Sequence, residues 1–268
     1  MITGVDHVVV VVADLERATD SYERLLGLEA SWRGEHPELG TANSLFRLAN
    51  TYVELLSPIG PGGLGDTLRD RLASHGEGPL CLAFGTDDAG AAASALRLRG
   101  VAVPQPSEGL GRDGRSGAER RWRNFLLPSE VTRGIYLMVI EHLSPRERLP
   151  EAKPSAATNS VVGAVDHVVV MTRSAEAVIS LYGDKLGLRL ALDRTFPERG
   201  MRLIFFRVGG LTVECAAAGD GESSLGPFPA AADGDRFWGI SYKVADIAAA
   251  RERVAQAGFD VSEVRAGL

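Results

Sequence analysis

The sequence is poor in cysteine, in long apolar runs and in blocks of like charge, and each shortage excludes a class of protein. Its two cysteines, Cys81 and Cys215, lie inside apolar stretches, so we expect a reducing, cytoplasmic location and no disulfide framework. No apolar run approaches the roughly 20 residues that span a bilayer. With 29 basic and 35 acidic residues, the net charge of −6 argues against nucleic acid or a membrane surface as a partner.

The sequence also lacks a glycine-rich phosphate loop, a nucleophile elbow and a CxxC motif, but it has an internal repeat. Residues 4–57 align with residues 164–217 without a gap, and 18 of the 54 positions are identical. A weaker repeat relates the segment that starts at Cys81 to the segment that starts at Gly239. The 268 residues therefore divide into four modules in the order A, B, A′, B′, which is enough for two domains.

The modules follow the pattern β-α-β-β-β, which is complete in A, B and A′. A β-branched run is followed by a helix, which the pattern starts at an N-cap residue and ends at a glycine such as Gly27. The predicted fold is α+β, with two tandem domains of paired modules. Each domain forms a cupped mixed sheet with the helices on its outer face. The expected N-caps are Asp14, Asp88, Ser174 and Asp246, and the expected further strands in the first domain are 28–33, 43–48, 51–57, 101–104, 121–127 and 134–141.

The repeat also sets the expected domain limits. Domain one covers 1–143, with modules at 4–58 and 79–143, and the proline-rich segment 144–160 has the composition of a linker. Domain two covers 161–268, with modules at 163–218 and 237–268. Because Leu268 aligns with Leu110, module B′ stops before its last two strands, so either the chain is truncated or the second domain is incomplete.

Strand alternation places a histidine and a glutamate together. His7 shares a strand face with Val9 and Val11, whereas Val8, Val10 and Val12 point to the opposite face, where the helix packs. By the same alternation Glu54 faces away from the helices, so both residues point into the open cup, which suits a small ligand. A glutamate in this apolar strand needs a partner, either His7 or an arginine, or a divalent metal ion.

These features resemble the vicinal oxygen chelate superfamily, which includes glyoxalase I, bleomycin-resistance proteins and extradiol dioxygenases. The stretches "DHVVVVVADLERATDSYERLLGL", "HPELGTANSLFRL" and "TYVELLSP" look like its glyoxalase-like domain branch. In that superfamily a metal is held by the first and last strands of two modules. The resemblance implies His7 and Glu54 as ligands in domain one, and His167 and Glu214 in domain two. At the other two ligand positions of domain one, Cys81 stands where a histidine is common and Met138 where a glutamate is common. Gly239 stands where a histidine is usual, which disfavours an extradiol dioxygenase.

Further residues are candidates for ligand contact at the rim of the first cup. The loop "HPELGTAN" carries His36, Thr41 and Asn43, all three of which differ in the second copy, so we favour domain one as the functional domain. In the basic run 112–125, Trp122 suits an apolar or aromatic ligand, and Arg121 or Arg123 an anionic one. Cys81 is the last candidate for ligand contact, and the alternative is that it is a buried structural cysteine.

The leading function is a small-molecule enzyme of the lyase or isomerase type, with Glu54 as metal ligand or general base and His7 as ligand or orienting group. One divalent ion (Zn, Ni, Mn or Fe) is the possible cofactor. The alternatives are a metal-free protein that binds or sequesters a small molecule, and a degenerate tandem domain that serves only assembly. A small molecule is the expected partner, and a homodimer is possible.

Overall fold

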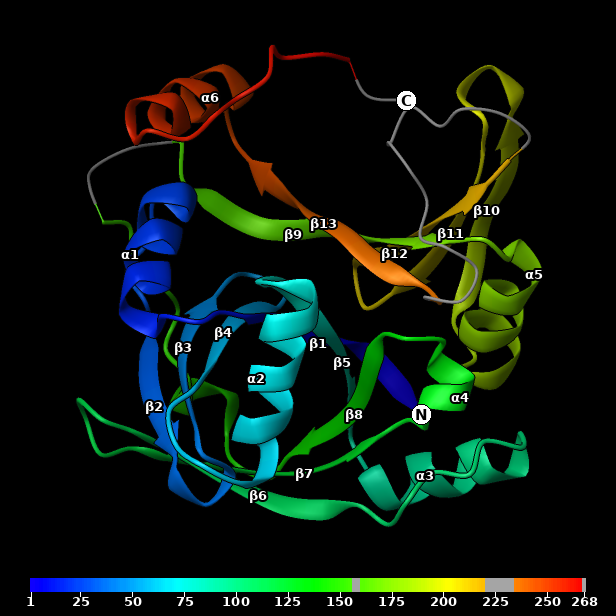
Figure 1. The fold of residues 1–268 in the computed structure, drawn as a ribbon, viewed down its shortest axis with the longest axis horizontal. Helices are drawn as coiled ribbons and strands as arrows, with labels where there is room; N and C mark the ends of the chain where they lie inside the picture. The colour runs from blue at the N-terminus through cyan, green and yellow to red at the C-terminus, as the bar shows by residue number, and fades with distance from the viewer. Residues whose placement is uncertain (156–159, 220–233, 267–268) are drawn as a thin grey trace.

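A computed structural model describes residues 1–155, 160–219 and 234–266. In domain one, eight strands close into a barrel in the order β1-β4-β3-β2-β6-β7-β8-β5, and in domain two five strands form the sheet β10-β11-β12-β9-β13 (Figure 1). The strands and helices of domain one are β1 (Ile2–Val11), α1 (Leu15–Leu26), β2 (Trp32–His36), β3 (Thr41–Arg47), β4 (Tyr52–Pro58), α2 (Gly63–His75), β5 (Gly78–Thr86), α3 (Ala89–Leu98), β6 (Ser107–Asp113), β7 (Glu119–Leu126), α4 (Ser129–Thr132) and β8 (Tyr136–His142). Those of domain two are β9 (Val162–Thr172), α5 (Ala175–Val178), β10 (Arg189–Phe196), β11 (Met201–Val208), β12 (Leu211–Ala218), β13 (Arg236–Val244) and α6 (Ile247–Gln256).

The predicted α+β fold and the helix signals are confirmed. The side chains of Asp14, Asp88, Ser174 and Asp246 each accept a hydrogen bond from the backbone N–H three residues later. Gly27 ends α1 in the left-handed conformation, with φ of 72°. No described helix is both long and apolar enough to cross a membrane.

Two of the expected strands differ in the structure: one is shorter than expected and the other does not form. Strand β2 starts at Trp32 rather than residue 28, because Leu28 bridges Pro154 and the N–H of Glu29 donates to the carbonyl of Lys153. The first residues of the expected strand 28–33 therefore pair with the predicted linker. Residues 101–104 form no strand, although Val101 and Val103 are buried.

The strand that replaces 101–104 is β6, which the sequence does not predict because it is rich in glycine. Its glycines make room for an indole ring, since a Cβ at Gly109 would lie 2.3 Å from Nε1 of Trp122. Gly111 lies against the same ring, where a Cβ would be 3.3 Å from its carbons. The composition of β6 thus reflects the packing of Trp122 rather than strand propensity.

Helix α2 is a further unpredicted element, since its first residues lie in the proline- and glycine-rich stretch 58–65. It does not lie on the outer face with α1 and α3. Leu68 of α2 is buried against Val9 and Leu56, which belong to the inward face of the barrel. This helix therefore closes one side of the barrel interior (Figure 1).

The two domains share one contiguous apolar core, which contains residues of both. Helix α6 lies beside α1 (Figure 1), and Arg253 of α6 donates to the carbonyls of Arg24 and Leu25 at the end of α1. Asn50 also joins the domains: its Nδ2 donates to the carbonyl of Val165 at 2.8 Å, and its Oδ1 accepts from the N–H of Val165 at 3.1 Å. Domain two is thus packed against domain one through polar and apolar contacts.

We expect Asn50→Ala to lower the free energy of unfolding by about 2–3 kcal/mol, because it leaves two backbone groups of the fully buried Val165 without partners. Urea unfolding followed by circular dichroism measures the change. Ser94→Ala, on the exposed side of α3, is the control and should cost no more than about 0.5 kcal/mol. Equal effects of the two substitutions would show that the Asn50 contact does not stabilise the protein.

Candidate functional site

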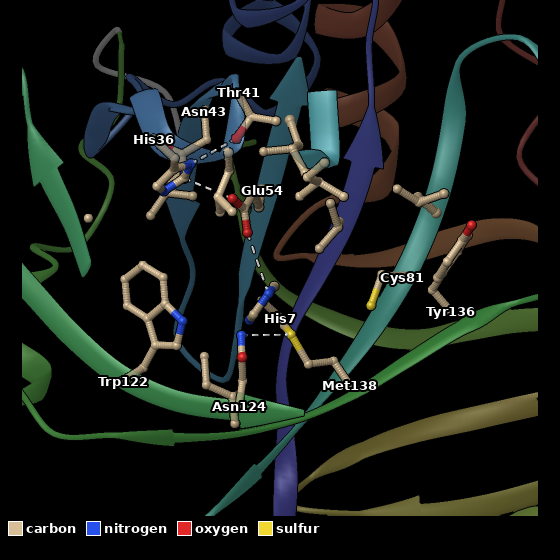
Figure 2. Close-up of a pocket in the computed structure, with 18 of the residues that line it drawn as sticks. His7, His36, Thr41, Asn43, Glu54, Cys81, Trp122, Asn124, Tyr136 and Met138 are labelled. Atoms are coloured by element: carbon tan, nitrogen blue, oxygen red, sulfur yellow. Dashed lines mark hydrogen bonds and ion pairs between the residues drawn. The ribbon is translucent and has the colours of Figure 1, made fainter. Parts of the chain in front are cut away.

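Inward-facing side chains of the barrel and one side of α2 enclose a cavity of about 250 Å³ in domain one. Its walls are largely apolar and aromatic, with leucines from α2, β3 and β4 and the rings of Trp32, Tyr52 and Trp122. Polar side chains interrupt this lining, and Figure 2 labels His7, His36, Thr41, Asn43, Glu54 and Asn124. His142 lines the cavity as well.

His7 and Glu54 meet at this cavity, as strand alternation predicts. Residues of β1 pair in parallel with β4, and Tyr52 and Glu54 share the inward face of β4 with Leu56. The Nε2 atom of His7 lies 3.4 Å from Oε2 of Glu54. The imidazole is almost fully buried and stacks on Tyr52, with ring centroids 4.5 Å apart. Only the side of His7 that faces Glu54 and the cavity is therefore available for chemistry.

Asp6 supports His7 from behind the cavity wall. A local irregularity in the pairing of β1 with β5, between Val5 and His7, accompanies this arrangement. Oδ1 of Asp6 lies 2.7 Å from Nδ1 of His7, and Oδ2 lies 2.9 Å from Nε2 of His142. Gly85 of β5 has no side chain between the two strands, and a Cβ there would come within 3.8–4.0 Å of Asp6. One carboxylate thus fixes the rings of two histidines that line the cavity.

Burial alone raises the pKa of Asp6, but the hydrogen bonds of His142 and His7 outweigh it and hold this pKa well below its ordinary value. Asp6 is therefore ionised at neutral pH and can only accept hydrogen bonds. It follows that Nδ1 of His7 carries a hydrogen, and that Nε2 is the ring nitrogen that faces Glu54. The sequence does not predict this contact of Asp6 with the site.

The three candidates from the loop "HPELGTAN" all line the cavity. Asn43 donates through Nδ2 to Oε1 of Glu54 at 2.7 Å, which orients the carboxylate. Nδ1 of His36 lies 3.1 Å from Oγ1 of Thr41, and the His36 ring meets Trp122 edge-on at 6.2 Å. Burial lowers the pKa of His36, against the opposing charge of Glu54, so His36 is neutral at pH 7.

Cys81 and Met138 lie at the cavity wall, on the two strands that the resemblance assigns to further ligands. The Cys81 thiol is buried, and burial raises its pKa, so it is protonated at neutral pH. The sulfur of Met138 accepts a hydrogen bond from Nδ2 of Asn124 at 3.3 Å. Both sulfur atoms thus behave as parts of the wall.

The prediction that Arg121 or Arg123 contacts a ligand is wrong, because neither lines the cavity. Trp122 lines the cavity as expected, but Arg123 lies on the opposite face and forms an ion pair with Glu108 outside. Arg121 is exposed on the same outer face. The arginine that lines the cavity is Arg120, because residues two apart share a strand face. The period of two, applied from Trp122, identifies Arg120 and Asn124 from the sequence, and a second lining arginine, Arg71, comes with the unpredicted helix α2.

The donor set at the cavity does not fit a catalytic divalent ion. Such an ion is normally held by three protein ligands and an open position. Of the four ligand positions that the resemblance implies, only His7 and Glu54 carry an imidazole or a carboxylate, and the other two carry Cys81 and Met138. Among the described residues, no group of three or more His, Cys, Asp and Glu side chains is placed to hold a metal ion. The steps considered below therefore use only the side chains of the protein.

Domain two repeats the pair without the cavity. Nε2 of His167 lies 3.5 Å from Oε2 of Glu214, and Asp166 binds Nδ1 of His167 at 2.8 Å. Burial raises the pKa of Glu214. Gly239 lies on the neighbouring strand β13 and offers no side chain, so the second copy also provides two potential ligands rather than three. None of these residues lines the cavity of domain one.

Comparison with known proteins places these features in a family. Residues 5–163 match the glyoxalase-like domain, and residues 166–267 match the glyoxalase/bleomycin resistance protein/dioxygenase superfamily. An ethylmalonyl-CoA/methylmalonyl-CoA epimerase of Cereibacter sphaeroides is 39% identical over 62 residues, which are 23% of this chain and 46% of that protein. The mitochondrial methylmalonyl-CoA epimerase of Homo sapiens is 40% identical over 55 residues, or 20% and 31%. The chain thus spans less than half the length of either curated relative.

Among solved structures, a mutant of 4-hydroxymandelate synthase from Streptomyces coelicolor superposes with a TM-score of 0.67 at 19% identity. The match covers 96% of this chain and 76% of that one. At this identity the likeness concerns the fold, which has two tandem units of the same kind. Together with the two family matches and the paired β-α-β-β-β modules of the barrel, it confirms the predicted resemblance. The chain belongs to the glyoxalase-like domain family of the glyoxalase/bleomycin resistance/dioxygenase superfamily.

Proposed function

We propose that domain one is an acid–base enzyme of the isomerase or lyase type, which moves a proton at a carbon next to a carbonyl group of a small molecule. The observation that carries this proposal is the position of Glu54. It is the one carboxylate among the described residues that line an otherwise largely apolar cavity. Asn43 holds one of its oxygens, and His7 lies 3.4 Å from the other. A fixed carboxylate in such a place suits a general base.

His7 supplies a second proton-transfer group in this proposal. Asp6 binds its Nδ1 atom, so Nε2 faces Glu54. A proton that Glu54 removes from the ligand can be shared with Nε2 and returned from there, on the same or on a neighbouring atom. The stacking of His7 on Tyr52 keeps the ring in this orientation. In this arrangement Glu54 and His7 both face the ligand, and Asp6 acts on it only through His7.

The names of the curated relatives support this class of reaction. Both are epimerases that act on acyl-CoA compounds, and epimerisation inverts a stereocentre. An inversion next to a carbonyl needs a proton to be removed from one face of the carbon and a proton to be returned to the other, and Glu54 is placed to carry out the removal. The cavity of about 250 Å³ accommodates the acyl part of such a compound or a small free acid rather than a larger molecule.

Proton exchange in D₂O, followed by ¹H NMR, tests the proposal with the purified chain. The probes are methylmalonyl-CoA, the hemithioacetal of glutathione and methylglyoxal, and 4-methyl-2-oxopentanoate. Each is tested after dialysis against EDTA and again with added Zn²⁺ or Mn²⁺. We expect the C–H signal next to a carbonyl to disappear in at least one probe without added metal. Exchange only in the presence of the added ion would contradict a reaction carried by side chains alone.

The second candidate function is binding without chemistry, and the apolar, aromatic walls of the cavity favour it. A protein of this kind holds a small molecule and releases it unchanged. It is distinguished by the same experiment: tight binding of a probe, measured by calorimetry, with no exchange of any C–H in either condition would support binding and overturn the enzyme proposal.

A further inference from the structure

Arg120 is a charged side chain confined to the cavity wall. It is 8% exposed, and its Cζ atom lies 5.6 Å from the ring centroid of Trp32 and 5.4 Å from that of Tyr52. A guanidinium group keeps its positive charge at every accessible pH. Arg120 also forms a side-chain hydrogen bond with Tyr52, and because a guanidinium carries five N–H groups, others remain able to donate to a ligand.

No carboxylate of the described residues forms an ion pair with Arg120. Its neighbours on the same β-ribbon behave differently, since Arg123 pairs with Glu108 and Arg112 pairs with Glu119. Those arginines are exposed, whereas a buried charge without a counter-charge is costly. Of the arginines of β7, Arg120 is the one that faces the cavity, where it is buried without an ion pair among the described residues.

The rest of the cavity does not neutralise this charge. Its one lining carboxylate, Glu54, is already bound by Asn43 and faces His7. Arg71 of α2 is a second lining arginine without an ion pair in the described part of the chain, and its Nη1 atom is buried without a hydrogen-bond partner. The cavity therefore presents two uncompensated arginines and one occupied carboxylate to a ligand.

We propose that the cavity is specific for small organic anions, whose carboxylate binds Arg120 and whose apolar body lies against Trp122 and the leucines. This inference rests on the proposed function and names its substrate class. Tyr52 connects the two parts of the site, because its ring stacks on His7 and also lies beneath Arg120. In this proposal Arg120 binds the carboxylate of a short acid in a bidentate pair of hydrogen bonds. The carbon next to the carboxylate then faces the His7–Glu54 pair.

Binding of matched acids and amides tests this inference. The probes are phenylacetate and 4-methylpentanoate, each compared with its uncharged amide, and the method is isothermal titration calorimetry. We expect both acids to bind the wild-type chain at least ten-fold more tightly than their amides. Equal affinities of acid and amide, or no binding of either acid at millimolar concentration, would overturn the proposal without the need for any variant.

Variants then assign the preference to one side chain. Arg120→Met keeps the length of the side chain without its charge and should remove the preference for the acid, and Arg120→Lys should keep only part of it. The matched control is Arg121→Met, which removes the same charge from the exposed face of the same strand and should leave both affinities unchanged. A folded Arg120→Met protein, verified by circular dichroism, that still prefers the acid would contradict the assignment.

Acid binding and proton exchange, measured side by side on the wild-type chain, separate this inference from the proposed function. Binding of the acids through Arg120 in a wild-type chain that catalyses no proton exchange would leave the anion site standing and remove the proposed reaction. Exchange on uncharged probes, with no preference for acids, would remove the anion site and leave the proposed reaction.

Discussion

Glu54→Gln is expected to lower the rate of proton exchange about 10³-fold while the affinity for the probe changes little. Glutamine has nearly the same shape as glutamate, and its carbonyl oxygen can still accept the hydrogen bond of Asn43. It cannot accept a proton from carbon. Single-turnover exchange in D₂O, with the probe that the wild-type chain exchanges fastest, measures the rate, and calorimetry measures the affinity.

The internal repeat provides the matched control for this prediction. Glu214 occupies the equivalent strand position in domain two and lies 3.5 Å from His167, but outside the cavity of domain one. Glu214→Gln should therefore leave the exchange rate unchanged. A Glu54→Gln protein that keeps more than a tenth of the wild-type rate, or a Glu214→Gln protein that loses as much, would show that Glu54 is not the base.

Strand alternation is strong enough to predict the centre of the site from the sequence. A strand with one face under a helix must place its valines there, so the position of Val8 and Val10 determines where His7 points. The same argument applies to Glu54 between Val53 and Leu55, both of which are fully buried. The meeting of the two side chains follows from the parallel pairing of β1 with β4.

The parts of the site that escaped prediction depend on contacts between distant segments. Helix α2 begins in a stretch of glycine and proline that indicates a loop, and it becomes a wall only because Leu68 packs onto the inner face of the barrel. Strand β6 has little strand propensity and exists because Gly109 and Gly111 lie against Trp122. Strand alternation from Trp122 identifies Arg120, whereas the charge of the five basic residues between 112 and 123 does not by itself separate it from the exposed Arg121 and Arg123.

Asp6→Asn is expected to lower the free energy of unfolding at pH 7 by about 2–4 kcal/mol, because one largely buried carboxylate accepts charge-assisted hydrogen bonds from two histidines. An asparagine oxygen can replace only part of these bonds, and its NH₂ group faces ring nitrogens that also donate. Urea unfolding at pH 7 measures the loss. The control is Asp166→Asn, the same substitution at the equivalent position of domain two, where the side chain is 40% exposed and the expected cost is below about 1 kcal/mol.

The pH dependence gives this prediction a second measurement. The folded protein holds the pKa of Asp6 below its unfolded value near 4, so the carboxylate stabilises the fold above pH 4, and this contribution is lost as the pH falls from there toward the folded pKa. The difference in unfolding free energy between wild type and Asp6→Asn should therefore be full at pH 6–7 and shrink below pH 4. A difference that stays constant from pH 7 to pH 3, or an Asp166→Asn protein that loses as much stability, would contradict the role of Asp6. A difference that shrinks as expected shows that Asp6 is ionised in the folded protein at neutral pH. The same ionised carboxylate binds Nδ1 of His7 and so leaves Nε2 facing Glu54. One side chain then accounts both for the stability of this contact and for the orientation of the imidazole in the cavity.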